Sequence, residues 1–185
     1  MNYDQEERKE FKKAIFGFLV LSLVVFFIYS SVLFQGSSWS VYFSPQGGCT
    51  RAIIKELDGA KKEVLVQAYS FTSTPIAEAL LNAHKRGVKV KVILDKSQKR
   101  GKYSSADFLA HSGVPTMIDA THAIAHNKVV VIDGETVITG SFDLTPAAEE
   151  KNAENLLVIR DRGLLGRYTQ NFWEHEVHSE PFSGK

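Results

Sequence analysis

A run of 21 residues without a charged side chain constrains this chain more than any other feature. It covers positions 14–34 and follows basic residues at positions 8, 9, 12 and 13. A helix needs about 20 apolar residues to cross a bilayer, whereas a cleavable signal peptide needs an apolar core of about 7–15. The length of the run favours an uncleaved anchor over a cleaved signal peptide, and the flanking basic cluster argues against a buried soluble helix. Cleavage after the small residues at 36–38 stays open as the alternative.

The charge pattern around this run also predicts the topology and the domain boundaries. Basic residues next to an anchor favour the cytosolic side, so residues 1–13 form a cytosolic flank and the rest of the chain is exported. The predicted organisation is an anchor or signal segment over 14–34, a linker over 35–40 and one folded domain over 41–180.

Composition excludes some function classes and leaves others open. Apolar residues make up 44% of the chain and charged residues 23%, which is typical of a globular protein. A net charge of +1 gives no global argument for a polyanionic partner. The single cysteine, Cys49, excludes an intrachain disulfide and a cysteine-based zinc site. His175 and His178 alone are weak grounds for a metal, so we expect no metal site.

On the C-terminal side of residues 14–34, strand-like segments alternate with amphipathic helix-like segments. Such interleaving predicts an α/β fold, with a mixed β-sheet sandwiched between helices. The expected strands are 40–44, 63–71, 88–95, 114–118, 128–132, 135–140 and 155–161, and the expected helices are 49–62, 75–87, 104–113 and 163–177.

The segment 126–141 is predicted to be a β-hairpin with a reactive end. Asp133 and Gly134 form a strong two-residue turn signal between two apolar segments. Residues two apart in a strand face the same side, so His126 and Lys128 project together. A neighbouring cation favours the neutral imidazole and offsets charge on phosphate oxygens. The pair therefore suits nucleophilic attack on a phosphate.

Other polar residues nearby divide into a structural one and possible partners of the histidine. Asp133 lies seven residues from His126, about 20 Å or more along a straight strand, so we expect it to stabilise the turn. Ser141 and Asp143 lie two residues apart just past the second hairpin strand, so their side chains would face the same side. Glu154 precedes a buried strand, where a carboxylate would accept the imidazole proton and orient the ring. A loop or capping role is the alternative for each of these three.

Several motifs together resemble the phospholipase D superfamily. "HNKVVVID" at 126–133 matches its H-x-K-x4-D signature, and "GSFDLT" at 140–145 resembles its G-S-x-N-x-T element. The segments 43–48, 68–95 and 151–159 are similar to further parts of its small single-motif bacterial nucleases. The resemblance spans about residues 41–178, and its elements follow one another in the family's order.

The resemblance implies phosphodiester cleavage without a metal or other cofactor. His126 would attack phosphorus to form a phosphohistidine, and Lys128 would bind the phosphate. Ser141 and Asp143 would support the phosphate site, and Glu154 would orient the nucleophile. A non-specific endonuclease acting on DNA or RNA is the leading function.

The chain carries one such motif, whereas the family's mechanism uses two histidines. The resemblance therefore implies a homodimer, with two copies of His126 facing each other across a two-fold axis. The expected location is a bacterial inner membrane, with the domain facing the periplasm or the exterior and residues 14–34 in the bilayer. Cleavage of the run would give a secreted or periplasmic protein.

Asp143 departs from the family pattern, which has asparagine at this position. An amide donates to a phosphate oxygen, whereas a carboxylate repels it by about 4 kcal/mol at 4 Å and an effective dielectric of 20. Three outcomes are open: Lys128 neutralises Asp143, Asp143 is protonated, or activity is weakened. The last would give a non-catalytic nucleic-acid-binding relative.

A basic segment supplies the expected substrate-binding surface. Eight basic residues and one acid between positions 85 and 102 give a local net charge of +7. Lys96, Lys99 and Arg100 lie in a polar loop after a strand, at the edge where open α/β sheets bind ligands. Nucleic-acid phosphates suit this patch, and anionic lipid headgroups are the rival ligand. A phospholipase D-type lipid phosphodiesterase is accordingly the alternative function.

Overall fold

The computed structural model describes residues 3–33, 36–101 and 104–184 and divides into two units, residues 1–36 and 37–185. The first unit holds one helix, α1 (Tyr3–Leu33). None of the helices among the described residues has both the length and the apolar character that crossing a membrane requires. The spanning helix expected over 14–34 is therefore not supported. Phe34, the last residue of that run, lies outside the described residues.

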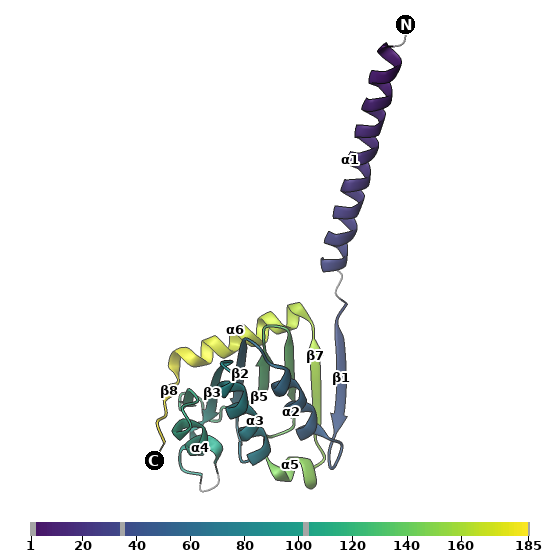
Figure 1. Cartoon of the computed structure of the whole chain (residues 1–185). Coiled ribbons are helices and arrows are strands. Elements are labelled where there is room, and N and C mark those ends of the chain that lie inside the picture. Colours follow the sequence, from purple (N-terminus) through teal and green to yellow (C-terminus); the bar gives the residue numbers. More distant parts are fainter. Residues whose placement is uncertain (1–2, 34–35, 102–103, 185) are drawn as a thin grey trace. The chain divides into compact units, whose positions relative to one another are not determined.

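The second unit is built on an eight-stranded mixed sheet (Figure 1). The strand order is β1-β7-β6-β5-β2-β3-β4-β8, in which β2, β3 and β4 run parallel and the remaining neighbours pair antiparallel. The strands are β1 (Ser38–Phe43), β2 (Glu63–Ala68), β3 (Lys89–Asp95), β4 (Thr116–Asp119), β5 (Lys128–Ile132), β6 (Thr136–Gly140), β7 (Asn155–Arg160) and β8 (Glu180–Pro181).

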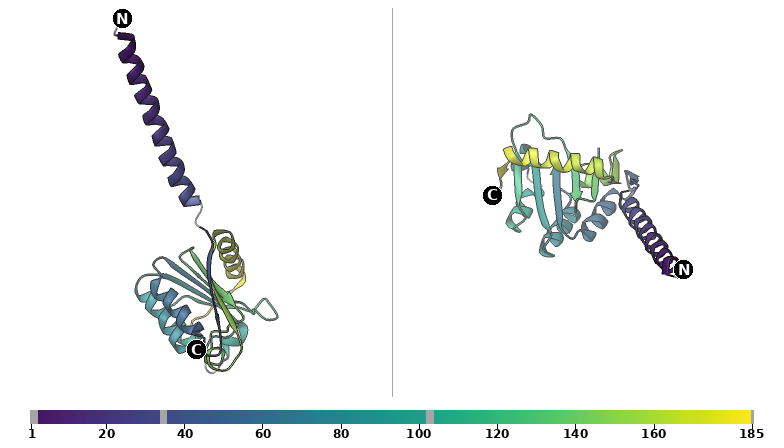
Figure 2. Two further views of the ribbon diagram at one scale, coloured as in Figure 1. Left: turned by 90° about the vertical axis from the view of Figure 1, so that its right-hand side faces the viewer. Right: turned by 90° about the horizontal axis from the view of Figure 1, so that it is seen from above.

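Helices cover both faces of this sheet (Figure 2), which confirms the expected α/β class. One long helix crosses one face, and the shorter helices lie on the other. The helices are α2 (Cys49–Gly59), α3 (Thr74–Lys85), α4 (Ser105–His111), α5 (Pro146–Glu150) and α6 (Arg162–His178), with a 3₁₀ turn, η1 (Lys96–Lys99), after β3.

Apolar periodicity explains the larger of the two cores. Five of the six residues of β2 are buried, as expected for a central strand covered on both faces. Pro75 occupies the first turn of α3, and the buried side of that helix carries Ile76, Leu80 and Ala83. These side chains join those of α2 and the sheet in one buried cluster.

The smaller core lies beneath α6. Leu165 and Phe172 of that helix pack on Leu65 and neighbouring strand residues. Lys91 of β3 adds a polar clamp, because its Nζ lies 2.6 Å from Glu176. The same ammonium lies 4.8 Å from the centroid of the Trp173 ring, within the range of a cation–π contact.

Element boundaries depart from the sequence-based expectations where tertiary pairing decides them. β1 begins at Ser38, inside the expected linker, because Ser38 pairs with Arg160 of β7. Part of the polar loop expected after the strand at 88–95 is helical, since the Asp95 carboxylate caps η1 by accepting from the Ser97 N–H at 2.8 Å. The short β8 and α5 were not expected.

Candidate active site

His126 lies two residues ahead of β5, at the edge of the sheet where β2 ends. Ala68, the last residue of β2, pairs with Lys128, and the Tyr69 N–H donates to the Asn127 carbonyl at 2.9 Å. The ring centroids of Tyr69 and His126 are 4.5 Å apart. The exposed imidazole is therefore supported by an aromatic ring at the end of two paired strands.

Lys128 brings a permanent cation to the same place. Its Nζ lies 3.4 Å from both Nδ1 and Nε2 of His126, so the ammonium is shared between the two ring nitrogens. It also lies 5.1 Å from the centroid of the Tyr69 ring. The structure thus brings together the two residues whose spacing predicted a common face.

Asp143 forms an ion pair with this lysine. The distance from Lys128 Nζ to Asp143 Oδ1 is 3.0 Å, and the two side chains are 8% and 24% exposed. That carboxylate oxygen is buried and accepts no directional hydrogen bond from any described residue, so the contact is electrostatic. Of the three outcomes open for Asp143, this geometry corresponds to neutralisation by Lys128. A substrate phosphate would therefore share the ammonium with a resident carboxylate.

Ser141 and Glu154 meet in a hydrogen-bond network between β6 and β7. The Ser141 hydroxyl donates to Glu154 Oε2 and accepts from the Asn155 backbone N–H at 3.1 Å. Asn152 Nδ2 donates to Glu154 Oε1 at 3.1 Å. Gly140 permits this approach: its φ is +149°, and a Cβ there would lie 2.2 Å from the Asn155 carbonyl oxygen.

Glu154 is therefore engaged on both carboxylate oxygens by Ser141 and Asn152. Within the described ranges, it makes no hydrogen bond to His126. Orientation of His126 by Glu154 stays a prediction. The Ser141 contact was not foreseen, although the two residues flank neighbouring strands in sequence.

Asp133 lies in the turn of the hairpin, at the far end of β5 from Lys128. Its carboxylate accepts three backbone N–H bonds, from Lys61 at 2.9 Å, Lys62 at 2.7 Å and Glu63 at 2.9 Å. Burial alone would raise its pKa, but these bonds outweigh that effect and hold the pKa below its usual value. The carboxylate ties the hairpin turn to the start of β2.

The basic residues open onto a groove that reaches Tyr69. Its volume is about 460 Å³, and its lining includes Tyr69, Lys96, Lys99 and Arg100. Lys96 Nζ donates to a backbone carbonyl at 2.8 Å, and Lys99 Nζ lies 3.9 Å from Glu180, so neither is clamped in a buried pair. Lys102 of the basic segment lies outside the described residues.

Tyr69 was missed by sequence reasoning, yet it links the groove to His126. The available signal was an aromatic residue just past the C-terminal end of a buried strand, where α/β sheets bind ligands.

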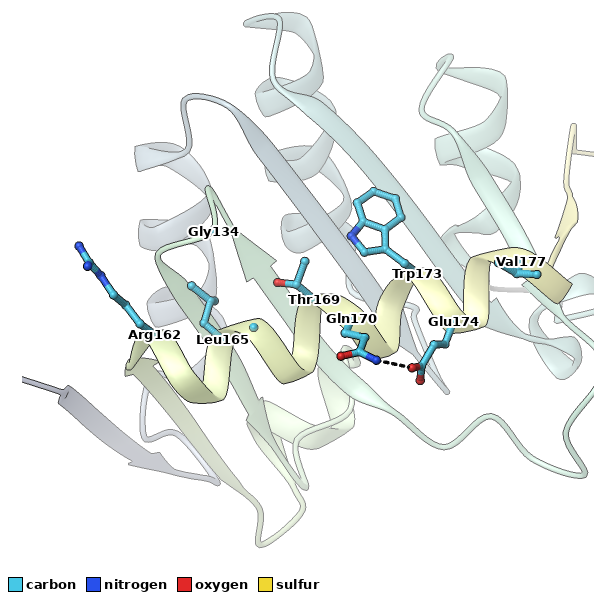
Figure 3. Close-up of a pocket in the computed structure, with 9 residues that line it drawn as sticks. Gly134, Arg162, Leu165, Thr169, Gln170, Trp173, Glu174 and Val177 are labelled. Atoms are coloured by element: carbon cyan, nitrogen blue, oxygen red, sulfur yellow. Dashed lines mark hydrogen bonds between the residues drawn. The ribbon is translucent and has the colours of Figure 1, made fainter.

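A larger cavity, about 720 Å³, lies along one side of α6 (Figure 3). It extends to Gly134 in the hairpin turn, at the opposite end of β5 from Lys128, and Leu165 and Trp173 are among its apolar lining residues. None of the catalytic residues expected from the sequence lines it.

The sequence of this chain is similar to those of several known proteins. Residues 53–176 match the family model described as cardiolipin synthase, phospholipase D-like domain. A phospholipase D of Rickettsia prowazekii is 40% identical over 151 residues, covering 82% of this chain and 74% of the relative. A mitochondrial cardiolipin hydrolase of Xenopus laevis is 33% identical over 125 residues, covering 66% and 60%.

Solved structures agree with these matches. The crystal structure of Nuc, a phospholipase D family member from Salmonella typhimurium, is similar with a TM-score of 0.76 and 35% identity, covering 80% of this chain and 99% of that one. The matching domain, fold and relatives show that this chain belongs to the phospholipase D superfamily.

Proposed function

We propose that the chain is a metal-independent phosphodiesterase that cleaves DNA or RNA with little sequence preference. One ring nitrogen of His126 attacks phosphorus, so that a P–N bond forms and the P–O bond to the leaving oxygen breaks. Lys128 offsets the charge that develops on the non-bridging oxygens. Water then attacks phosphorus and breaks the P–N bond, which releases a phosphomonoester and the free imidazole, and the proton of the water returns to the histidine that protonated the leaving oxygen.

The single observation that carries this proposal is the position of Tyr69. Its ring lies 4.5 Å from that of His126, and it also lines the basic groove with Lys96, Lys99 and Arg100. A polyanionic strand held by those cations passes next to the nucleophile, and the aromatic ring offers a surface on which a base can stack. Such contacts read phosphates and base faces and carry little sequence information.

The leaving oxygen needs a proton from a second histidine, and we assign it to His126 of a second copy. Within the described residues, His122, His175 and His178 converge on Asp119 and are engaged there. His126 is exposed and free to face its symmetry mate. A two-fold dimer would supply attacking and protonating imidazoles from one motif per chain.

A lipid phosphodiesterase is the second candidate, and a non-catalytic nucleic-acid-binding relative is the third. The relative named mitochondrial cardiolipin hydrolase favours the lipid reading. The ion pair of Lys128 with Asp143 favours the non-catalytic one, because it occupies the expected phosphate-binding cation.

One experiment separates the three. The full chain is incubated with plasmid DNA, RNA and phospholipid vesicles in EDTA, at a temperature where circular dichroism shows that it stays folded. Nicking that persists in EDTA and vanishes in His126→Ala supports the nuclease. Headgroup release alone would replace it with the lipid enzyme, and binding without turnover would replace it with the non-catalytic relative.

The shared active site has its own test. Wild-type and His126→Ala chains are unfolded together, refolded at varied ratios and assayed at constant total protein. A site that needs both copies of His126 gives activity proportional to the square of the wild-type fraction, about one quarter at equal mixing. A linear decline, about one half at equal mixing, would show that each chain works alone.

A further inference from the structure

Four metal-ligating side chains from three separate segments meet outside the active site. The acid ends β4, one histidine lies in the loop before His126, and two histidines lie on the last turn of α6. We name this group the Asp119 cluster; it consists of Asp119, His122, His175 and His178. One ligand atom from each lies within 4.8 Å of all the others.

A single carboxylate oxygen is the centre of this cluster. Oδ2 of Asp119 lies 2.9 Å from His122 Nδ1, 2.7 Å from His175 Nδ1 and 3.3 Å from His178 Nε2. The other oxygen is oriented by the Thr121 backbone N–H, which donates to it at 3.0 Å. A carboxylate oxygen offers two lone-pair sites, so three imidazole N–H groups directed at Oδ2 would exceed what it can accept. A cation shared by the oxygen and the lone pairs of the ring nitrogens would remove this excess.

We propose that the Asp119 cluster binds one divalent transition-metal ion of the zinc class. Three imidazoles and one carboxylate match the ligand types and the number of a tetrahedral zinc site, and Mg²⁺ instead prefers an all-oxygen shell. Bonds of about 2.0–2.1 Å place tetrahedral ligand atoms about 3.3 Å apart. The distance from Asp119 Oδ2 to His178 Nε2, 3.3 Å, matches this value. Those to His122 and His175, 2.9 and 2.7 Å, are shorter, so these two rings would move slightly away from the oxygen as the nitrogens converge on an ion.

Burial favours a closed, structural site with an entry path. The Asp119 side chain is fully buried and that of His175 is 14% exposed, whereas His122 and His178 are 45% and 31% exposed. An ion could enter past the two exposed rings. With four protein ligands no coordination position is left for substrate, which separates this ion from the proposed metal-independent chemistry.

The site would join the end of α6 to the loop that leads to His126. That loop is held at two further points, because Lys96 Nζ donates to the His122 carbonyl at 2.8 Å and the Ala125 N–H donates to Asp95 at 2.8 Å. Metal binding would add a third anchor and position the segment just ahead of the nucleophile.

The test is metal binding by the purified full chain, prepared without a histidine tag and stripped with a chelator. Titration calorimetry with Zn²⁺ should give one ion per chain, and Mg²⁺ should give no heat of binding. The melting temperature should rise with Zn²⁺. Both readouts are independent of phosphodiesterase activity, so failure of the proposed function leaves this test intact.

Variants locate the ion. Asp119→Asn and His178→Gln should each weaken Zn²⁺ binding by more than about 100-fold, since they remove direct ligands. Because His178 is partly exposed, its substitution should leave the fold intact. His178→Gln therefore keeps the test valid if Asp119→Asn misfolds. His111→Gln, outside the cluster, should bind as wild type does. Absence of stoichiometric Zn²⁺ binding in the wild type, or unchanged affinity in folded His178→Gln, would overturn the proposal and leave a carboxylate hydrogen-bonded to imidazoles.

Discussion

The two ends of β5 carry polar residues of one sequence signature, but these residues differ in exposure and in the partners that they contact. At the start, His126 is exposed, and the ammonium of Lys128 lies 3.4 Å from both of its ring nitrogens. At the other end, Asp133 is half-buried and accepts three backbone N–H bonds. The first arrangement leaves an exposed imidazole available to a ligand, whereas the second uses its carboxylate to hold the turn against the start of β2. Residues that share a motif therefore need not share a role.

The largest expected effect comes from His126, just ahead of β5. His126→Ala should lower turnover by at least about 10⁴-fold, because it removes the attacking atom. The melting temperature should stay near that of the wild type, since the side chain is exposed. Rates and thermal melts measure the two effects separately, with His111→Ala as control. Retention of more than about a tenth of the wild-type rate would contradict the assigned nucleophile.

The opposite pattern, a loss of stability with little change in rate, is expected at Asp133. Asp133→Asn should lower the free energy of unfolding by about 1–3 kcal/mol, because a charged acceptor of three N–H bonds is lost. Urea titration measures this, and the rate of the folded variant should stay close to wild type. A variant that folds and dimerises normally but loses turnover would contradict the structural role.

The same carboxylate predicts a pH dependence. Its folded-state pKa lies below the unfolded value of about 3.9. The stability it contributes is therefore present above about pH 4 and is lost as the pH falls through the folded pKa. Urea titrations across this range should show a smaller acid loss for Asp133→Asn than for the wild type. Equal losses of stability in the two proteins as the pH falls would show that Asp133 does not cause the acid sensitivity.

A smaller effect on activity is expected at Asp143, the carboxylate that pairs with Lys128. Asp143→Asn should leave kcat/KM unchanged or raise it by up to about tenfold, since Lys128 is released to the substrate and a repulsion is removed. Steady-state kinetics on a nucleic-acid substrate measure this. A large loss of activity would show that the carboxylate has a role of its own.

The smallest effect concerns the groove. Arg100→Ala should weaken DNA binding a few-fold and reduce the slope of log affinity against log salt by about 1. Fluorescence anisotropy over a range of salt concentrations measures both quantities. Lys85→Ala, on the last turn of α3, serves as the control for loss of one charge. Equal changes in the two variants would show that the groove has no special part in binding.

Local patterns were sufficient for much of the fold, and long-range packing decided the rest. The alternation of apolar residues predicted β2, α3 and the hairpin, because it depends only on which face of an element is buried. The common face of His126 and Lys128 followed from strand parity. No local pattern could predict that Ser141 would contact Glu154, since the pairing of β6 with β7 brings them together.

The Asp119 cluster is a second contact that local sequence patterns could not predict. The sequence displayed only the i, i+3 pair of His175 and His178, and no metal site was expected. The other two members lie more than fifty residues away in sequence, in β4 and the loop after it. They meet the pair only because α6 crosses the sheet and ends beside β4.

The central claim is that His126 forms the covalent intermediate, and trapping that intermediate tests it most directly. The full chain is mixed with a short oligonucleotide, quenched with alkali within the first turnovers, digested and analysed by mass spectrometry. The account predicts a nucleotide phosphoryl adduct on the peptide carrying His126, and none on peptides carrying His122, His175 or His178. Turnover without an adduct on His126, or with the adduct on a histidine of the Asp119 cluster, would contradict it.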